Sequence, residues 1–283
     1  MADTSDILPG MGTFEGGYIV EGDPATTEPI TAGSSQPIGT VENSSGSVTV
    51  QHADGTSEQL EADSPIFQGD QLKTGGDGSV GVVLADGTSF SMAEGGKMVM
   101  DEMVYDPSTQ ESSIGINAVQ GVFTFVSGQI AKTDPDAMTL ETPVATIGIR
   151  GTQVGIEVGE GGQSNVILME EADGFVGEVV VSNEGGVQIL NNALQGTSIV
   201  NQQTGPAESF QVNEDQLVGT FGRALGHLPA NDNNNANTYN QEIPGEQSAV
   251  EEAEQQEAQE EQCAQEEQQQ EQAAGQDLSE EQL

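Results

Sequence analysis

Apolar residues in this chain come in short runs that alternate with polar and turn residues, with no sustained helical spacing. From residue 38 to residue 212 the runs are rich in Val, Ile and Thr, and turn residues recur about every 8 to 12 positions. The pattern predicts strands at 38–41, 47–51, 80–84, 88–92, 97–103, 114–119, 122–126, 138–141, 144–149, 152–158, 165–169, 175–182, 187–190, 196–200 and 209–212. We therefore predict an all-β fold, a solenoid-like or sandwich-like stack of short strands.

Asp-Gly pairs separate several of these runs. Glycine after aspartate supplies the positive φ that a tight hairpin turn needs, so we interpret these pairs as turns. Their carboxylates could also attract Ca²⁺, but none lies in an EF-hand string, and we expect at most weak Ca²⁺ binding and no other cofactor. The pairs are Asp54-Gly55, Asp77-Gly78, Asp86-Gly87 and Asp173-Gly174.

Composition divides the chain into four parts. Residues 1–37 lack a sustained period and predict a flexible leader, and residues 38–212 form the β domain. Residues 213–241 predict a closing segment, with a short helix at 213–228 followed by an Asn-rich loop. Residues 242–283 are rich in Glu and Gln and hold no basic residue, which predicts a disordered or partly helical acidic tail.

Charge restricts the partners and the location of the protein. With 47 Asp and Glu against five Lys and Arg, the net charge is -42, which opposes binding to nucleic acids and anionic membranes. No apolar run reaches the roughly 18 to 20 residues that a transmembrane helix needs, and the N-terminus lacks the features of a signal peptide. We expect an extracellular, cell-surface or periplasmic protein exported without such a signal, with a cytoplasmic location and a homo-oligomer left open.

The sequence contains little that predicts catalysis. Residues 76–81 fit the dinucleotide string G-x-G-x-x-G, but a β-like run follows where the nucleotide-binding fold needs a helix. His52 and His227 are too few for a multi-histidine zinc site, and we expect both to be exposed. Cys263 is the only cysteine, so no intrachain disulfide can form. We predict no enzyme activity and no catalytic, cofactor-binding or metal-binding residues.

Arg150 is the most conspicuous single residue, because it interrupts the apolar stretch 141–158. A guanidinium in such a stretch needs acceptors, and its planar fork suits several at once. We predict that Arg150 is a structural clamp that bonds neighbouring carbonyls or a carboxylate such as Glu141 or Asp70. The alternative is that it contacts a ligand or a partner.

Two motifs resemble the FecR domain family. The first runs from Gly69 to Met92 (GDQLKTGGDGSV, then VLADGTSFSM), and the second from Thr142 to Thr152 (TPVATIGIRGT). The resemblance covers residues 38–158 well and continues loosely to 212. It implies that the following residues carry the fold: Gly69, Asp70, Thr74, Asp77, Gly78, Asp86, Gly87, Thr142, Pro143, Arg150, Gly151 and Thr152.

The resemblance also implies a range of functions. Well-known members are membrane-anchored bacterial regulators that receive a signal from an iron-siderophore receptor and control a sigma factor, and we find no transmembrane or sigma-binding part here. We therefore expect a non-enzymatic β module of an exported or cell-surface bacterial protein that contacts proteins or glycans. The alternatives are an extracytoplasmic signalling domain related to siderophore regulation and a carbohydrate-active β-helix enzyme.

Overall fold

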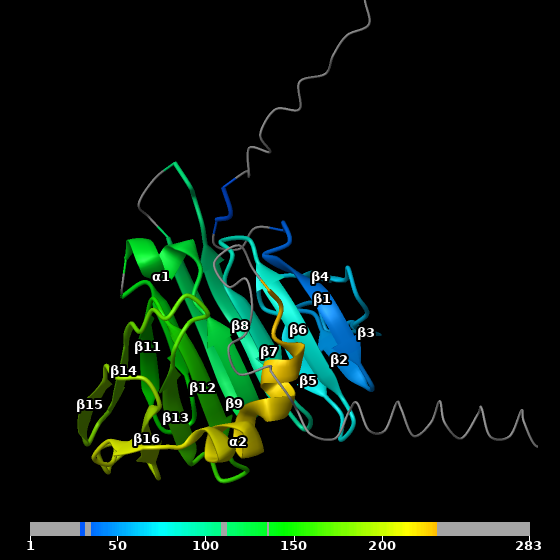
Figure 1. Cartoon of the computed structure of the whole chain (residues 1–283). Coiled ribbons are helices and arrows are strands. Elements are labelled where there is room, and N and C mark those ends of the chain that lie inside the picture. Colours follow the sequence, from blue (N-terminus) through cyan, green and yellow to red (C-terminus); the bar gives the residue numbers. More distant parts are fainter. Residues whose placement is uncertain (1–28, 32–34, 109–111, 135, 231–283) are drawn as a thin grey trace, which may run out of the picture.

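The structure is a computed structural model that describes residues 29–31, 35–108, 112–134 and 136–230. Its described part is mostly β: 17 strands form one large sheet that does not close, and two helices accompany it (Figure 1). The helices are α1 (Gln129–Thr133) and α2 (Glu214–His227). Within these described residues, no helix combines the length and apolar character that crossing a membrane requires.

The first strands build one end of the molecule. They are β1 (Gly39–Ser45), β2 (Val48–Gln51), β3 (Ser57–Gln59), β4 (Pro65–Ile66), β5 (Gln71–Thr74), β6 (Ser79–Leu84), β7 (Ser89–Met92) and β8 (Lys97–Val104). The long strand β9 (Ser113–Val126) follows. The remaining strands are β10 (Met138–Glu141), β11 (Thr146–Arg150), β12 (Gln153–Val158), β13 (Ser164–Met169), β14 (Glu178–Asn183), β15 (Gly186–Leu190), β16 (Gln195–Ile199) and β17 (Phe210–Gln211).

Strand β9 belongs to two rows of strands. Its first part pairs with β8 and β10, and its last part, from Gly121, pairs with β7 and β12. One row therefore runs β3-β2-β5-β8-β9-β10-β11-β14-β15, and the other runs β4-β1-β6-β7-β9-β12-β13-β16-β17. The change of row occurs at Gly121, where φ is +119° and a Cβ would meet the Gly96 Cα at 2.5 Å. A residue with a side chain has no space at this bend.

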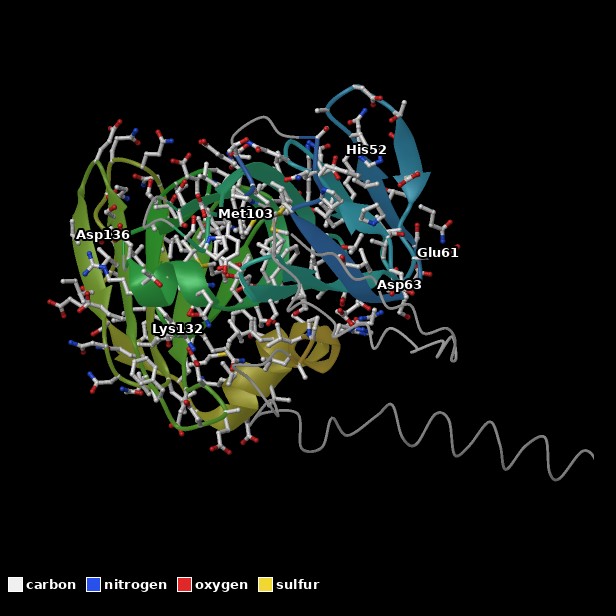
Figure 2. All side chains as sticks on the ribbon, turned by 90° about the horizontal axis from the view of Figure 1, so that it is seen from above. His52, Glu61, Asp63, Met103, Lys132 and Asp136 are labelled. Carbon is white, nitrogen blue, oxygen red and sulfur yellow. The ribbon has the colours of Figure 1, made fainter. Side chains whose placement is uncertain are left out.

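The two rows share one apolar core. Buried side chains alternate with exposed ones along strands such as β2 and β8, as the period-two pattern requires. Phe90 and Phe125 come from one row and Ile116 from the other, and all belong to the same cluster. Figure 2 shows Met103 inside the molecule, whereas Glu61 and Asp63 lie at its rim.

Helix α2 covers the outer face of the second row. Asn213 begins it with a capping box, in which its side chain accepts the Gln216 N–H and its backbone N–H donates to the Gln216 side chain. Leu217, Phe221 and Leu225 then form a second apolar cluster with residues of β13. In Figure 1 the yellow helix lies beside β6, β7 and β9, which it contacts.

The predicted all-β class is confirmed, while the finer prediction of a solenoid-like or sandwich-like stack stays a prediction. The runs 114–119 and 122–126, predicted as two strands, are one strand, because the chain bends at Gly121 without leaving the ladder. The short strands β3, β4 and β5 and the helix α1 have no counterpart in the prediction. Ile30 lies in the predicted flexible leader, yet it is buried and pairs with Tyr105. The predicted acidic tail, 242–283, lies outside the described residues.

Candidate functional site

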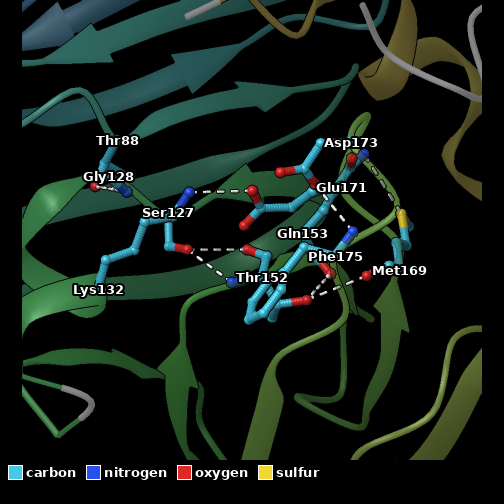
Figure 3. A network of polar contacts seen from close by, with 10 residues as sticks. All are labelled: Thr88, Ser127, Gly128, Lys132, Thr152, Gln153, Met169, Glu171, Asp173 and Phe175. Carbon is cyan, nitrogen blue, oxygen red and sulfur yellow. Dashed lines mark hydrogen bonds and ion pairs between the residues drawn. The ribbon is translucent and has the colours of Figure 1, made fainter. Parts of the chain in front are cut away.

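The two sequence motifs meet at a dipeptide that lies between them in the chain. Ser127 and Gly128 follow β9 and begin the turn into α1. The Gly128 N–H donates to the Thr88 Oγ1 at 3.0 Å, and the Thr152 N–H donates to the Ser127 Oγ at 2.7 Å (Figure 3). Thr88 belongs to the first motif and Thr152 to the second, so this dipeptide joins them.

Asp86 fastens the start of α1 to the first motif. Its buried carboxylate accepts the Thr88 N–H at 3.0 Å, the Thr88 hydroxyl at 2.8 Å and the Ile130 N–H at 3.2 Å. Its backbone carbonyl accepts the Gln129 N–H at 2.9 Å. Burial raises the pKa of Asp86, and the hydrogen bonds from Thr88 and Ile130 oppose that shift. Both oxygens of the carboxylate thus accept hydrogen bonds, from two backbone N–H groups and one hydroxyl.

Lys132 fastens the end of α1 to the loop after β13. Its Nζ lies 3.1 Å from the Glu171 Oε2, and the Glu171 side chain is only 1% exposed. Burial raises the pKa of Glu171, while Lys132 partly offsets the effect. The other oxygen, Oε1, has no hydrogen-bond partner among the described residues. Figure 3 shows this carboxylate between Lys132 and the loop that carries Asp173.

Arg150 is a clamp between segments, but its partners differ from those predicted. Its guanidinium donates to the Asp136 Oδ1 at 2.6 Å and to the Glu178 Oε1 at 2.5 Å. Both hydrogen bonds raise the pKa of Arg150. The predicted acceptors Glu141 and Asp70 were wrong, because β11 pairs with β14 and so sets Arg150 opposite Glu178.

Asp70 makes a separate contact in the row that includes β5. Its buried carboxylate accepts the Phe67 N–H at 2.9 Å and lies 2.7 Å from the His52 Nδ1. The hydrogen bond with Asp70 raises the pKa of His52, and burial opposes it. The prediction that His52 is exposed was wrong, since its side chain is 20% exposed and packs edge-on against Phe67.

The remaining motif residues each organise their own turn. The Thr74 Oγ1 donates to the Ala93 carbonyl at 2.5 Å and accepts the Gly96 N–H at 2.8 Å. The Asp77 carboxylate accepts the Ser47 N–H at 3.3 Å. Close by, a Cβ at Gly78 would meet the Ser47 carbonyl oxygen at 2.2 Å. At three other motif glycines, Gly69, Gly87 and Gly151, the backbone φ is positive.

Thr142 and Pro143 shape the turn from β10 to β11. The Thr142 Oγ1 accepts the Val144 and Ala145 N–H groups at 3.3 and 3.1 Å, and the Pro143 carbonyl accepts the Gln202 amide at 3.0 Å. An open hollow of about 390 Å³ lies against this turn. Hydroxyls and amides line it together with two carboxylates, those of Glu141 and Glu184.

Some of the motif residues therefore lie close together in the structure, whereas the others lie apart from them. Asp86, Gly87, Gly151 and Thr152 lie around α1, with Arg150 adjoining through Asp136. Figure 2 shows Lys132 and Asp136 on one side of the molecule and His52 on the other, so the Asp70 contact is separate.

Four residues of the α1 network are absent from the sequence prediction: Ser127, Gly128, Lys132 and Glu171. The available signal was weak. Ser-Gly directly after a strand is a common strand end, and Lys132 is conspicuous only because the chain has five basic residues. Their importance comes from partners that lie far away in the sequence.

The side chains of the α1 network hold distant segments of the chain together. The Asp86 carboxylate accepts two backbone N–H groups and the Thr88 hydroxyl, and the Glu171 carboxylate pairs with Lys132. No group of three or more His, Cys, Asp or Glu side chains that could hold a metal ion occurs in the part of the chain that the structure describes.

Comparison with known proteins finds a family for part of the chain. Residues 70–172 match the family model described as FecR protein. This part of the chain is therefore a FecR domain, and its limits enclose the whole α1 network from Asp86 to Glu171. A search of curated proteins finds no match.

Matching solved structures overlap the chain only in part. One is described as a cell surface anchoring domain, with 37% identity over 22% of this chain and 82% of that domain and a TM-score of 0.22. Two others are crystal structures of a Parabacteroides distasonis ATCC 8503 protein assigned as an anti-sigma factor, with 14% and 16% identity and TM-scores of 0.39 and 0.40. They match 50% and 53% of this chain, which spans 60% and 63% of theirs.

Proposed function

We propose that this chain is an extracytoplasmic regulatory domain of the FecR type that acts through contacts with another protein. The FecR match over residues 70–172 carries the proposal. This role corresponds to the extracytoplasmic signalling domain, which we favour over a surface module that contacts proteins or glycans.

The α1 network supports a role in binding rather than in catalysis. Asp86 and Glu171 are buried, and their contacts hold α1 between distant turns. Such contacts fix α1 against the turns beside β6, β7 and β13, which belong to one row of strands, and we propose that the surface carries the function. We propose that the domain performs no reaction and needs no cofactor, with weak Ca²⁺ binding at the acidic surface as the only exception.

We also propose that the short strands stack in a solenoid-like or sandwich-like manner. Such a stack offers long faces and edge strands to a partner.

A gene deletion in the native bacterium tests the proposal. Transcript levels in the deletion strain are compared with those in strains complemented by the wild-type gene or by a Ser127→Ala variant. We expect a coherent set of transcripts, governed by one sigma factor, to change several-fold and to return with the wild-type gene. A strain whose transcripts stay unchanged overturns the regulatory role.

A second candidate is the exported surface module that contacts proteins or glycans. The hollow against the Thr142 turn favours it, because hydroxyls, amides and carboxylates are the groups that bind sugar hydroxyls. Cell fractionation with a glycan array tests it. Recovery of the native protein only in the soluble cytoplasmic fraction contradicts both candidates. Turnover of a polysaccharide, abolished by a single Asp or Glu substitution, would instead support the carbohydrate-active enzyme.

A further inference from the structure

Strand β15 forms an open edge of the sheet. It pairs in register with β14 on one side, and no ladder with another described strand is present on its other side. Its side chains Val187 and Ile189 are 64% and 45% exposed. Most edge strands carry charges, prolines or bulges that prevent another strand from pairing with them. This strand has none of these.

The edge also lies in an unusual part of the sequence. Residues 185–207 contain no Asp, Glu, Lys, Arg or His, although the chain as a whole has 47 acidic residues. Glu184 and Glu208 bound this uncharged segment, which covers β15, β16 and the loop that follows. The other long uncharged run, residues 112–131, contains the central strand β9, for which burial explains the lack of charge.

Charge indicates which partner the edge accepts. Two copies of a chain with a net charge of -42 repel one another, and most contacts between them bring carboxylates together. The uncharged segment is a surface on which two copies can meet without this cost.

The strand is also complementary to itself. Antiparallel pairing of two β15 strands about Gln188 places Val187 of one copy opposite Ile189 of the other, twice. Apolar side chains then face each other on the exposed side, and the unpaired backbone groups of both edges find partners. Such a contact has the two-fold symmetry of most homodimers.

We infer that β15 is the contact of a homodimer, in which the sheets of two copies join edge to edge. This inference is independent of the proposed regulatory role. A strand of five residues buries less than the about 1,000 Å² typical of stable interfaces, so the dimer is weak. Salt strengthens it, because screening reduces the repulsion between the two acidic copies.

Sedimentation of the full chain over a range of concentrations, at low salt and at high salt, tests the inference. We expect a concentration-dependent dimer that is tighter at high salt. Ile189→Glu places two like charges at the contact and should raise the dissociation constant at least about tenfold. The matched control is Thr49→Glu, which adds the same charge at an exposed position of β2, a strand with neighbours on both sides, and should leave dimerisation unchanged.

Amide hydrogen exchange locates the contact. We expect residues 186–190 to become more protected as the protein concentration rises, and Ile189→Glu to remove this effect. Ile189 is exposed, so the variant should keep the wild-type melting temperature. A protein that stays monomeric at every concentration and salt, or a dimer that Ile189→Glu does not weaken, overturns the inference. Protection that is independent of concentration also overturns it, since another segment of the same chain would then cover the edge.

Discussion

The Thr152 N–H donates to the Ser127 hydroxyl oxygen at 2.7 Å, across 25 positions of the sequence. The pairing is reciprocal, since the Ser127 N–H donates to the Thr152 carbonyl at 3.2 Å. Both residues are fully buried. This contact ties the second FecR motif to the end of β9, and Gly128, the next residue, ties the first motif to the same place.

Ser127→Ala should destabilise the domain. The substitution removes the acceptor of a buried N–H, which costs about 1–3 kcal/mol when no other group replaces it. Urea denaturation followed by circular dichroism measures the change. Ser108→Ala is the matched control, because Ser108 is exposed and its hydroxyl bonds the neighbouring Asp106 carboxylate, and it should change the unfolding free energy by less than about 0.5 kcal/mol. Equal stability of the two variants would contradict a structural role for Ser127.

Gly128→Ala should be at least as damaging. A Cβ at this position would meet the Thr88 N at 2.3 Å and the Asp86 carbonyl oxygen at 2.6 Å, and both are backbone atoms that cannot move independently. Overpacking of this kind costs about 1–3 kcal/mol. Gly76→Ala provides the control, because a Cβ there meets nothing within 4 Å. A melting temperature that falls equally in both variants would show that the loss of a glycine, and not the close approach, is responsible.

Arg150→Ala should lower the melting temperature modestly. The guanidinium side chain is 33% exposed and Asp136 is 79% exposed, so each ion pair contributes about 1 kcal/mol or less. Arg150→Lys should recover only part of the loss, because an ammonium lacks the fork that reaches Asp136 and Glu178 together. Thermal melts at low and high salt measure the effect, which should shrink at high salt. An effect that salt does not change would indicate that packing of the side chain dominates.

Glu171→Gln should change how stability depends on pH. Burial raises the pKa of Glu171, so the folded protein keeps a proton at pH values where the unfolded chain has lost it. The contribution of Glu171 to the unfolding free energy therefore falls as pH rises from its ordinary pKa of about 4.3 through the raised value. The stability advantage of wild type over Glu171→Gln should be smaller at pH 7 than at pH 4. The exposed Glu208 provides a control substitution, Glu208→Gln. A flat difference between wild type and Glu171→Gln would contradict the burial of a charged carboxylate.

His52→Gln should show its largest cost in mild acid. The contact with Asp70 raises the pKa of His52, so the folded state binds the proton more tightly than the unfolded chain does. That stabilisation is complete below the ordinary histidine pKa of about 6.5, and it is lost as pH rises through the raised pKa. Denaturation at pH 5.5 and pH 9 should give a larger loss of unfolding free energy at pH 5.5. Equal losses at the two pH values would show that the imidazole acts mainly through its packing against Phe67 and would contradict the contribution of the Asp70 contact.

Short-range patterns of apolar and turn residues were enough to predict several of the strands. The range predicted as 138–141 agrees with β10, and the run 80–84 lies within β6, because a short apolar run bounded by turn residues depends only on neighbours within a few positions. The helix at 213–228 was also predicted, and a capping box at Asn213 begins it. The five-residue helix α1 was missed because its first turn depends on Asp86, which lies 44 positions away.

Sequence by itself determined the β class of this protein and the match of residues 70–172 to the FecR family model, since these depend on short-range backbone preferences and on motifs. It also showed that Arg150 needs acceptors. Only the tertiary structure decided which ones, because the pairing of β11 with β14 places Glu178 at Arg150 and leaves Glu141 and Asp70 elsewhere. The same holds for Ser127 and Thr152: a hydroxyl and an amide become partners only when the sheet brings distant segments within hydrogen-bonding distance.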